Sequence, residues 1–385
     1  MRVYVSYLSL VNFRNYRRLE MDLPEGPLVF YGGNAQGKSN LLEAVYLLCL
    51  AKAYRASSDR EAICKTSVED PDHAQALSVV QRGQDRVRIM VDMRLEAPER
   101  EGSPPHLRKD IRVNGIPRLA SDLVGVVNAV LFDAEDIQLV AGPPAGRRRF
   151  LDILISQMDR GYLRALQRYQ RVVYQRNHLL RLLREGRAGT GEIDFWNDAI
   201  VQEGSFITLR RHETIRDLKS LMEEAHCQLT GNRDELTADY ASSIPLEGAG
   251  QEEIRHSFER TLETGRDREM ALGSSQWGPH RDDLRLLLSG MEASTYSSRG
   301  QARTITIALR LAEGMLLEKE RRESPILLLD DVLSELDPSR RRRLLEYVSR
   351  SQQAFISTTD LERASESFLS GAARFFVENG TVKSI

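Results

Sequence analysis

Two phosphate-site segments near opposite ends of the chain constrain its fold more than any other feature of the sequence. The first, GGNAQGKS at residues 32–39, follows the apolar run PLVFY and precedes a helix-like pattern. The second, ILLLDD at residues 326–331, is an apolar run that ends in two aspartates. A phosphate loop works beside a buried parallel strand that carries an acidic residue at its end. The two ends of the chain should therefore form one α/β domain, with the middle of the chain inserted between them.

The first segment matches the pattern G-x-x-x-x-G-K-[ST] and lies between a strand and a helix, as the motif requires. In such a loop the backbone N–H groups surround phosphates, the lysine neutralises the β- and γ-phosphate oxygens, and the hydroxyl reaches Mg²⁺. The predicted nucleotide-binding residues are Gly32, Gly33, Asn34, Ala35, Gln36, Gly37, Lys38, Ser39 and Asn40.

The second segment supplies the acidic partners of this loop. Four apolar residues, from Ile326 to Leu329, are typical of a buried parallel strand, which places Asp330 at its C-terminal edge. There a carboxylate can hold Mg²⁺ through water, so Ser39 and Asp330 are the predicted metal-site residues. Asp331 stands where a general base would orient or deprotonate water. Lys38 and Asp331 are therefore the predicted catalytic residues.

The periodicity of the remaining sequence divides the chain into three parts. Strand patterns are expected at residues 3–13, 28–31, 77–80 and 87–95, at a hairpin around Asn114–Gly115, and again from residue 284 onward. Helical periodicity dominates residues 147–229 and 252–263. We predict an α/β head of residues 1–145 plus 270–385 and an inserted, all-helical second domain of residues 146–269.

Length and composition indicate how many domains the protein has and in which compartment it works. A chain of 385 residues is long enough for two domains, and its three cysteines are odd in number and widely spaced. That spacing argues against a disulfide framework and against a CxxC metal site. No apolar run is long enough to span a bilayer, and the N-terminal residues alternate like a strand instead of a signal peptide. We expect a cytoplasmic protein with no membrane partner.

The net charge of −2 conceals a basic segment, because residues 160–187 contain eight arginines and one acid. Helical spacing places several of these arginines on one face. They could contact DNA phosphates, although a solvated basic face is the alternative explanation. The candidate DNA-binding residues are Arg164, Arg168, Arg171 and Arg176.

A polar turn, SSRGQ at residues 297–301, precedes a second apolar-periodic helix. Helix N-termini that carry a glycine bind anions readily. The ordered series of phosphate loop, Ser-x-Gly-Gln turn, Asp-Asp strand and the S-x-L-D segment at Ser334–Asp337 resembles the ABC-type ATPase head of the SMC class. The resemblance implies ATP as the nucleotide, a D-loop with Ser334 and Asp337, and a signature turn that caps the ATP of a second subunit in a head-to-tail homodimer. The signature residues are Ser297, Ser298, Arg299, Gly300 and Gln301.

Finer motifs resemble the bacterial RecF recombination mediators over nearly the full length. They include NFRNY, GGNAQGKSNLLEAVYLL, VLFDAEDIQLVAGPPAGRRRFLD, QRNHLL, GPHRDDL and ILLLDDVLSELD. This resemblance implies an ATP-dependent dimer that binds duplex and gapped DNA. It also implies a weak ATPase used as a switch, and cooperation with RecO and RecR in loading recombinase at single-strand gaps.

Two positions depart from the pattern of transporter-type ABC heads. Those heads carry a histidine after the last core strand, where this chain has Thr359. The glutamine that usually touches Mg²⁺ has no clear counterpart, although Glu135, Asp136 or Gln138 could replace it. Both departures favour slow turnover.

Three other classes of protein fit the sequence less well. A nuclease-coupled ABC-type ATPase carries an acidic catalytic domain after the head, but only 48 residues follow Asp337, and they hold no D-x-D cluster. A transporter ATPase subunit does not need a long basic insert. A long-armed chromosome-organising protein needs a longer insert, because about 130 residues folded as a hairpin reach only about 60–70 Å.

Overall fold

The computed structural model describes residues 2–55, 58–64, 72–96, 105–231, 234–246, 248 and 250–385. The chain forms two compact units. The first contains Met1–Asp136, Cys227–Gly231 and Arg303–Ile385, and the second contains Ile137–His226 and Asn232–Ala302. The division between them crosses two helices, α6 (Ile193–Thr230) and α9 (Arg299–Arg321).

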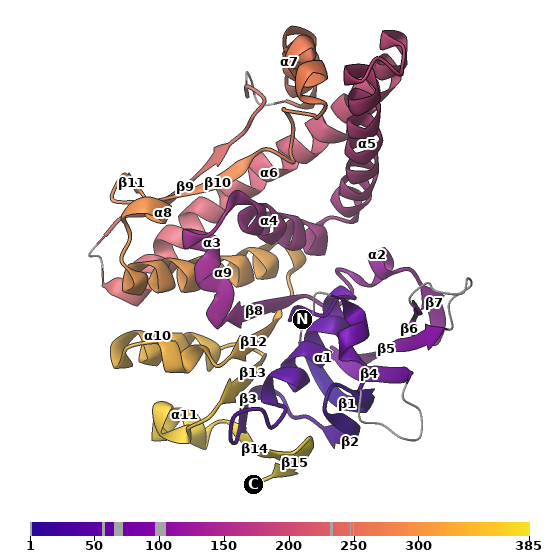
Figure 1. The fold of residues 1–385 in the computed structure, drawn as a ribbon. Helices are drawn as coiled ribbons and strands as arrows, with labels where there is room; N and C mark the ends of the chain where they lie inside the picture. The colour runs from indigo at the N-terminus through magenta and orange to yellow at the C-terminus, as the bar shows by residue number, and fades with distance from the viewer. Residues whose placement is uncertain are drawn as a thin grey trace. The chain divides into compact units, whose positions relative to one another are not determined.

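A six-stranded sheet in the first unit joins the two ends of the chain, as the sequence predicts. Its strand order is β15–β14–β3–β13–β12–β8, and all neighbours are parallel except β14 and β15. In Figure 1 the indigo strand β3 lies between the yellow strands β13 and β14. The strands are β3 (Gly26–Tyr31), β8 (Ala129–Asp133), β12 (Ile326–Asp330), β13 (Gln353–Thr358), β14 (Ala373–Glu378) and β15 (Thr381–Ser384).

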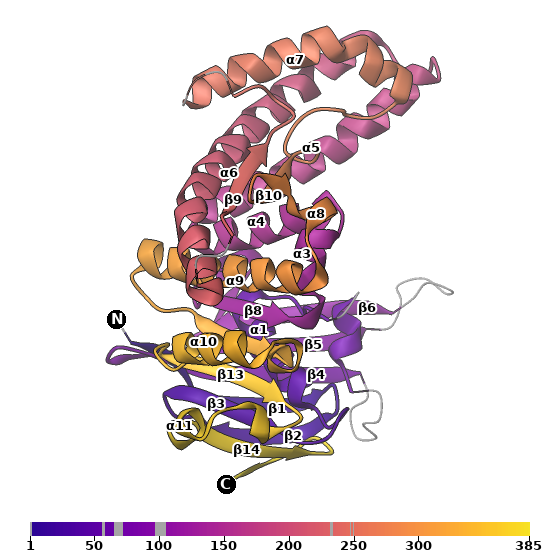
Figure 2. The ribbon, with the colours of Figure 1, turned by 90° about the vertical axis from the view of Figure 1, so that its left-hand side faces the viewer.

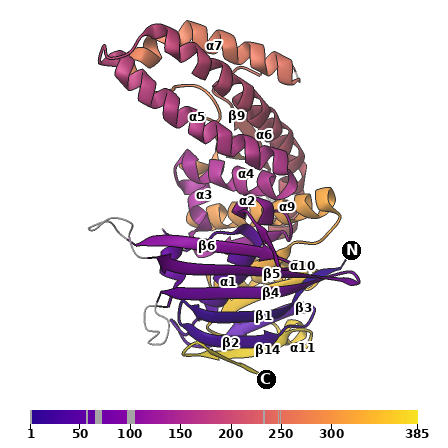
Figure 3. The ribbon, with the colours of Figure 1, turned by 90° about the vertical axis from the view of Figure 1, so that its right-hand side faces the viewer.

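A second sheet of the same unit is antiparallel, with the order β2–β1–β4–β5–β6–β7, and Figure 3 shows it nearly face-on. The predicted hairpin lies between β6 and β7, where Asn114 and Gly115 have φ angles of 52° and 79°. Both angles are positive, as a type I′ turn requires. The strands are β1 (Val3–Phe13), β2 (Tyr16–Asp22), β4 (His73–Arg82), β5 (Asp85–Glu96), β6 (His106–Val113) and β7 (Ile116–Arg118).

Helix α1 (Lys38–Leu50) packs against strands of both sheets, among them β12 and β13 of one and β4 and β5 of the other. Nearly every residue of α1 is buried, because a helix that is apolar on all sides needs cover on all sides. The shorter elements of this unit are η1 (Asp59–Ala62), α2 (Ala120–Leu123), η4 (Val332–Glu335), α10 (Pro338–Val348), η5 (Leu361–Arg363) and α11 (Glu366–Ser370), with η2 (Ala134–Ile137) at its border.

The second unit is mainly helical, and its long helices α5, α6 and α7 are clear in Figure 2. The insert is not all-helical, however, because β9 (Leu236–Ala241) pairs with β10 (Asp283–Leu288), which also pairs with β11 (Met291–Glu292). Leu236 and Ala238 alternate with more exposed residues, a short strand pattern inside a polar stretch. The helices are α3 (Gln138–Ala141), α4 (Pro144–Met158), α5 (Arg160–Arg184), η3 (Thr190–Glu192), α6, α7 (Gln251–Leu272) and α8 (Ala293–Tyr296).

The motifs RRRFLD and GPHRDD bind each other inside the second unit. Arg147 forms two hydrogen bonds of 2.7 Å with the Asp283 carboxylate, and Arg148 donates to the Asp282 carbonyl oxygen at 2.8 Å. The fully buried carboxylate of Asp282 accepts hydrogen bonds from the Ser243 N–H and hydroxyl, both at 2.7 Å, and from the Tyr240 hydroxyl. These two motifs therefore join α4 to the β9–β10 pair.

His280, inside the GPHRDD motif, is a structural residue of this unit. Its Nδ1 lies 2.7 Å from the Tyr169 hydroxyl, and its Nε2 lies 3.2 Å from the Ser275 carbonyl oxygen. Burial lowers the pKa of His280 to about 4, so the ring is neutral near pH 7.

The Asp282→Ala substitution should lower the free energy of unfolding of the second unit by about 3–5 kcal/mol, because buried donors on Tyr240 and Ser243 lose their acceptor. Urea unfolding followed by tryptophan fluorescence measures this, since both tryptophans, Trp196 and Trp277, lie in this unit.

The matched control is Asp239→Ala, because Asp239 is exposed on β9 beside Tyr240. Its unfolding curve should overlay that of the wild type. Wild-type stability in Asp282→Ala would show that these hydrogen bonds do not hold the unit together.

Candidate nucleotide-binding site

The phosphate loop connects β3 to α1 and is shaped by two glycines. Gly32 has a φ angle of 153° and Gly37 one of 119°. A Cβ added at Gly32 would lie 2.2 Å from the Val377 carbonyl oxygen, and one added at Gly37 would lie 2.7 Å from Asn15 Nδ2. Gly32 requires glycine because the Val377 backbone leaves no room for a side chain, and Gly37 favours glycine because its φ angle lies in a region that other residues rarely adopt.

The NFRNY segment supports this loop from outside. Asn15 Nδ2 donates to the Gln36 carbonyl oxygen at 2.9 Å, and the Tyr16 hydroxyl donates to the Gly37 carbonyl oxygen at 2.9 Å. Asn40, which the sequence assigns to the ATP site, donates to Asn15 Oδ1 at 2.8 Å. In this structure the Asn40 side chain therefore belongs to the support of the loop.

Lys38 folds over the loop that precedes it. Its Nζ donates to the carbonyl oxygens of Gly32 at 2.8 Å and Gly33 at 2.6 Å. Burial lowers the pKa of Lys38, while the carboxylates of Asp331 and Asp330 act in the opposite direction. The ammonium group thus lies at the loop centre, where a phosphate oxygen could replace the carbonyl oxygens as its partner.

Asp330 lies at the end of β12 and accepts three hydroxyl groups. Its Oδ1 accepts hydrogen bonds from the Ser39 and Ser357 hydroxyls, both at 2.7 Å, and its Oδ2 accepts one from the Tyr54 hydroxyl at 2.7 Å. The loop serine and the strand aspartate are therefore in direct contact. A hydroxyl and a carboxylate are hard oxygen ligands of the kind that Mg²⁺ prefers, so this pair fits the predicted metal.

Asp331 has the properties expected of a base. Its Oδ1 is buried and has no hydrogen-bond partner among the described residues, and its N–H donates to Ser357 Oγ at 2.9 Å. Burial and the neighbouring Asp330 raise the pKa of Asp331, whereas Lys38 lowers it. A carboxylate with a raised pKa and an unpaired oxygen can accept a proton or orient water.

Sequence reasoning missed three residues of this site: Tyr54, Ser357 and Asp133. Parallel pairing places Ser357 of β13 and Asp133 of β8 directly beside Asp330. Burial raises the pKa of Asp133 to about 6, against the effect of a hydrogen bond from the Glu135 N–H. The signal for Ser357 and Asp133 was a polar residue at the end of an apolar strand, whereas Tyr54 carries no motif.

The three candidates for the missing glutamine lie in different surroundings. Arg310 holds the Asp136 carboxylate with hydrogen bonds of 2.6 and 2.9 Å, so Asp136 is already paired. Glu135 is exposed in the same unit, and Gln138 is exposed in the second unit. Thr359, which replaces the histidine of transporter-type heads, is also exposed.

The signature turn begins α9 with a reciprocal cap. The Gln301 N–H donates to Ser298 Oγ at 3.3 Å, and the Ser298 N–H donates to Gln301 Oε1 at 2.9 Å. Ser298, Arg299 and Gly300 are exposed, and a Cβ added at Gly300 would meet no atom within 4 Å. The glycine is therefore not required by packing within this chain.

The D-loop residues have local partners. Ser334 Oγ donates to the Asp331 carbonyl oxygen at 2.7 Å. Asp337 caps α10, because its carboxylate accepts the N–H groups of Ser339 at 3.0 Å and Arg340 at 3.1 Å.

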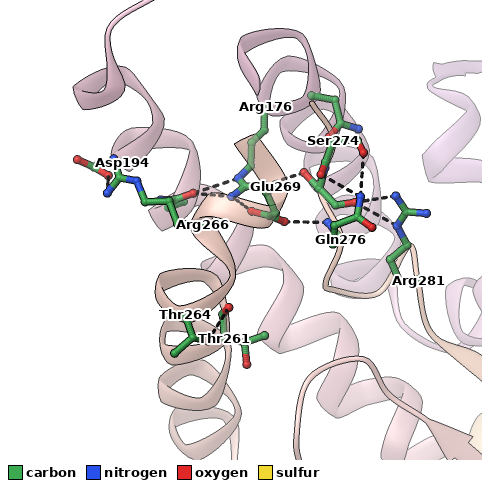
Figure 4. Close-up of polar contacts among 12 residues, drawn as sticks. Arg176, Asp194, Thr261, Thr264, Arg266, Glu269, Ser274, Gln276 and Arg281 are labelled. Atoms are coloured by element: carbon green, nitrogen blue, oxygen red, sulfur yellow. Dashed lines mark hydrogen bonds and ion pairs between the residues drawn. The ribbon is translucent and has the colours of Figure 1, made fainter. Parts of the chain in front are cut away.

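The candidate DNA-binding arginines of α5 do not share one environment. Arg164 and Arg171 are exposed and have no ion-pair partner within the described part of the chain, whereas the exposed Arg168 pairs with Glu203. Arg176 is 2% exposed, and its assignment to a DNA surface is wrong because its guanidinium is buried against Glu269 (Figure 4). The same guanidinium donates two hydrogen bonds to Asn197 Oδ1. The helical pattern could not reveal a partner 93 residues away.

A family model described as the RecF/RecN/SMC N-terminal domain matches residues 4–382. The chain is 38% identical over 388 residues to the DNA replication and repair protein RecF of Herpetosiphon aurantiacus, with 99% of both chains covered. It is 39% identical over 392 residues to the protein of the same name from Chloroflexus aurantiacus, again with 99% of both covered.

Solved structures agree with these relatives. The recombination mediator protein RecF with ATPrS superposes with a TM-score of 0.88 at 29% identity, covering 100% of this chain and 98% of that one. An Smc head domain from Pyrococcus furiosus, at 16% identity and a TM-score of 0.55, covers 100% of this chain and 96% of that one and shares the fold alone. Fold and site together define an ABC-type ATPase head of the RecF/RecN/SMC class.

Within that class, this chain belongs to the RecF family, which confirms the resemblance seen in the motifs. Among the described residues, no helix is both long and apolar enough to cross a membrane.

Replacing Lys38 with methionine should weaken ATP binding by about 100-fold, because the loop loses the ammonium group that could exchange its carbonyl partners for a phosphate oxygen. Titration with a fluorescent ATP analogue measures the Kd. Lys52→Met is the control, since Lys52 is exposed just after α1, and it should bind like the wild type. Equal affinity in both variants would contradict the assigned role of Lys38.

Proposed function

We propose that this RecF-family chain is an ATP-dependent DNA-binding protein of recombinational repair and replication. In this proposal two copies pair head-to-tail around two ATPs, bind duplex or gapped DNA, and act with RecO and RecR to promote recombinase loading at single-strand gaps. Slow hydrolysis then resets the dimer. The relatives named for DNA replication and repair, and the solved RecF neighbours named with ATPrS and ATP in the RecFOR pathway, support it.

The observation that best supports the proposed dimer is the exposure of the signature turn. Ser298 and Gln301 preform the start of α9, and a Cβ added at Gly300 would meet no atom of the described residues within 4 Å. A glycine that local packing does not require allows another molecule to approach the backbone closely. The start of a capped helix favours an anion such as the γ-phosphate. A second copy that carries ATP on its phosphate loop would supply that anion.

Within one copy, each residue of the site would have a separate task. Lys38 would turn from the loop carbonyl oxygens to the phosphates, and Ser39 with Asp330 would hold Mg²⁺, which neutralises phosphate charge during transfer. Asp331 would orient the attacking water. Thr359 offers a hydroxyl without acid–base power near neutral pH, which supports a switch with slow turnover.

This proposal keeps the sequence-based division into an ATPase head of residues 1–145 plus 270–385 and an arm of residues 146–269. The compact units differ from it, because residues 137–145 and 270–302 cluster with the second unit. Arm residues Arg164 and Arg171 supply unpaired positive charge for DNA phosphates, with Arg168 beside them.

Substituting Ser298 with arginine should leave ATP binding intact and abolish ATP-dependent pairing, because the bulky cation would occupy the place of the γ-phosphate of the other copy. Sedimentation velocity with no nucleotide, with ADP and with ATP plus Mg²⁺ tests this. The wild type should form a dimer only with ATP. A Ser298→Arg protein that still pairs normally with ATP would rule out a signature acting in trans.

The double variant Arg164→Ala/Arg171→Ala should weaken duplex DNA binding and reduce the slope of log K against log salt by about 2, one for each lost phosphate contact. Fluorescence anisotropy at several salt concentrations measures the slope. The charge-matched control is Arg268→Ala/Arg285→Ala, two exposed arginines on α7 and β10. Equal slopes in the two double variants would exclude α5 as the DNA surface.

A further inference from the structure

The C-terminal hairpin of β14 and β15 ends in a tight turn that lies against the phosphate loop. Asn379 and Gly380 form this turn with φ angles of 47° and 72°, so both are in the left-handed region. The Gly380 N–H donates to the Gln36 carbonyl oxygen at 3.0 Å. The Asn379 N–H donates to Gln36 Oε1 at 2.8 Å. Two successive backbone N–H groups of the turn thus donate hydrogen bonds to one loop residue.

The carbonyl oxygen and both side-chain polar atoms of Gln36 are hydrogen-bonded. Its carbonyl oxygen accepts a second hydrogen bond from Asn15 Nδ2 at 2.9 Å, and its Nε2 donates to the Asn34 carbonyl oxygen at 3.2 Å. A carbonyl oxygen has two lone pairs, so this acceptor is saturated. Rotation of the Gln36 peptide would break these bonds. Gly37 and Lys38 follow directly, so the direction of their N–H groups depends on how Gln36 is held.

The other end of the loop also lies against β14. Residue Phe376 pairs with Tyr31 of β3, which places the next residue, Val377, beside Gly32. A Cβ at Gly32 would lie 2.2 Å from the Val377 carbonyl oxygen, and a Cβ at Gly380 would lie 2.3 Å from the Asn15 carbonyl oxygen. Backbone of the hairpin therefore packs directly on the loop backbone at Gly32, and at Gly380 it packs on the backbone of Asn15, which itself supports the loop.

We propose that the Asn379–Gly380 turn is a positioning element of the nucleotide site, although it lies outside every nucleotide-binding motif of the chain. It holds Gln36, and through Gln36 it orients the loop N–H groups that would receive phosphate. The inference rests on the proposed binding of ATP by this loop. Because linkage is reciprocal, ATP should in turn stabilise the hairpin.

The chain contains a matched turn that allows the test. Asn114 and Gly115 form an Asn-Gly turn with φ angles of 52° and 79°, between β6 and β7 of the same unit. A Cβ at Gly115 would meet no atom within 4 Å. Alanine at residue 115 or at residue 380 therefore has a similar backbone cost, but only Gly380→Ala disturbs the loop.

Affinity for a fluorescent ATP analogue and the kinetics of hydrolysis should be compared in Gly380→Ala and Gly115→Ala. Gly380→Ala should raise Kd and KM by about tenfold and leave kcat at saturating ATP near the wild-type value, since the catalytic carboxylates are untouched. Gly115→Ala should bind within about twofold of the wild type. A Gly380→Ala protein with wild-type Kd would overturn the proposal.

Hydrogen exchange in the wild type keeps the test decisive if Gly380→Ala does not fold. ATP should slow exchange of the amides in β15 and leave those in β7 unchanged, and Lys38→Met should show no such effect. Unchanged exchange in β15 despite ATP binding would overturn the inference alone. A wild-type protein that does not bind ATP would overturn the proposed function as well.

Discussion

The hydrogen bond between Ser39 and Asp330 joins residues that are 291 positions apart, and it exists only because β3, β13 and β12 are parallel neighbours. That arrangement brings the ends of three strands to one edge of the sheet, where the loop lysine, the two aspartates and Ser357 meet. Around this edge, α1 is buried between two sheets and the loop is closed by contacts from both terminal regions. The nucleotide site is thus a product of sheet topology more than of any single motif.

Several motifs that mark the RecF family perform support instead of chemistry. Asn15 and Tyr16 hold the phosphate loop from outside, and Arg147 with Asp283 ties α4 to the short sheet of the second unit. Substitution in these segments should be costly, because a lost partner leaves a largely buried polar group unpaired. In the sequence these motifs serve to recognise the family, whereas in the structure their side chains stabilise the fold around the site.

The sequence predicted those parts of the fold that local patterns determine. Strand β12, the loop with α1, and the Asn114–Gly115 hairpin follow from apolar runs, glycine spacing and turn chemistry. The remaining features depend on contacts between residues that are far apart in the sequence, which local patterns do not reveal. Strand β9 has a weak local pattern and forms by pairing with β10, which also pairs with β11. Tyr54 belongs to the site because it donates a hydrogen bond to Asp330, 276 residues away. Arg176 sits on the predicted basic helix but faces a buried glutamate.

The position of β3 between β13 and β14 also sets an order of events during synthesis. The first 136 residues lack both sheet neighbours of β3, and the loop support at Asn379 and Gly380 is among the last segments made. The second unit draws all its residues from 137–302 and can form its core earlier. Under the proposed role of this turn, the phosphate loop therefore receives its last support at the end of synthesis. A truncated product that ends before residue 378 carries the whole phosphate-loop motif but lacks the turn that holds Gln36.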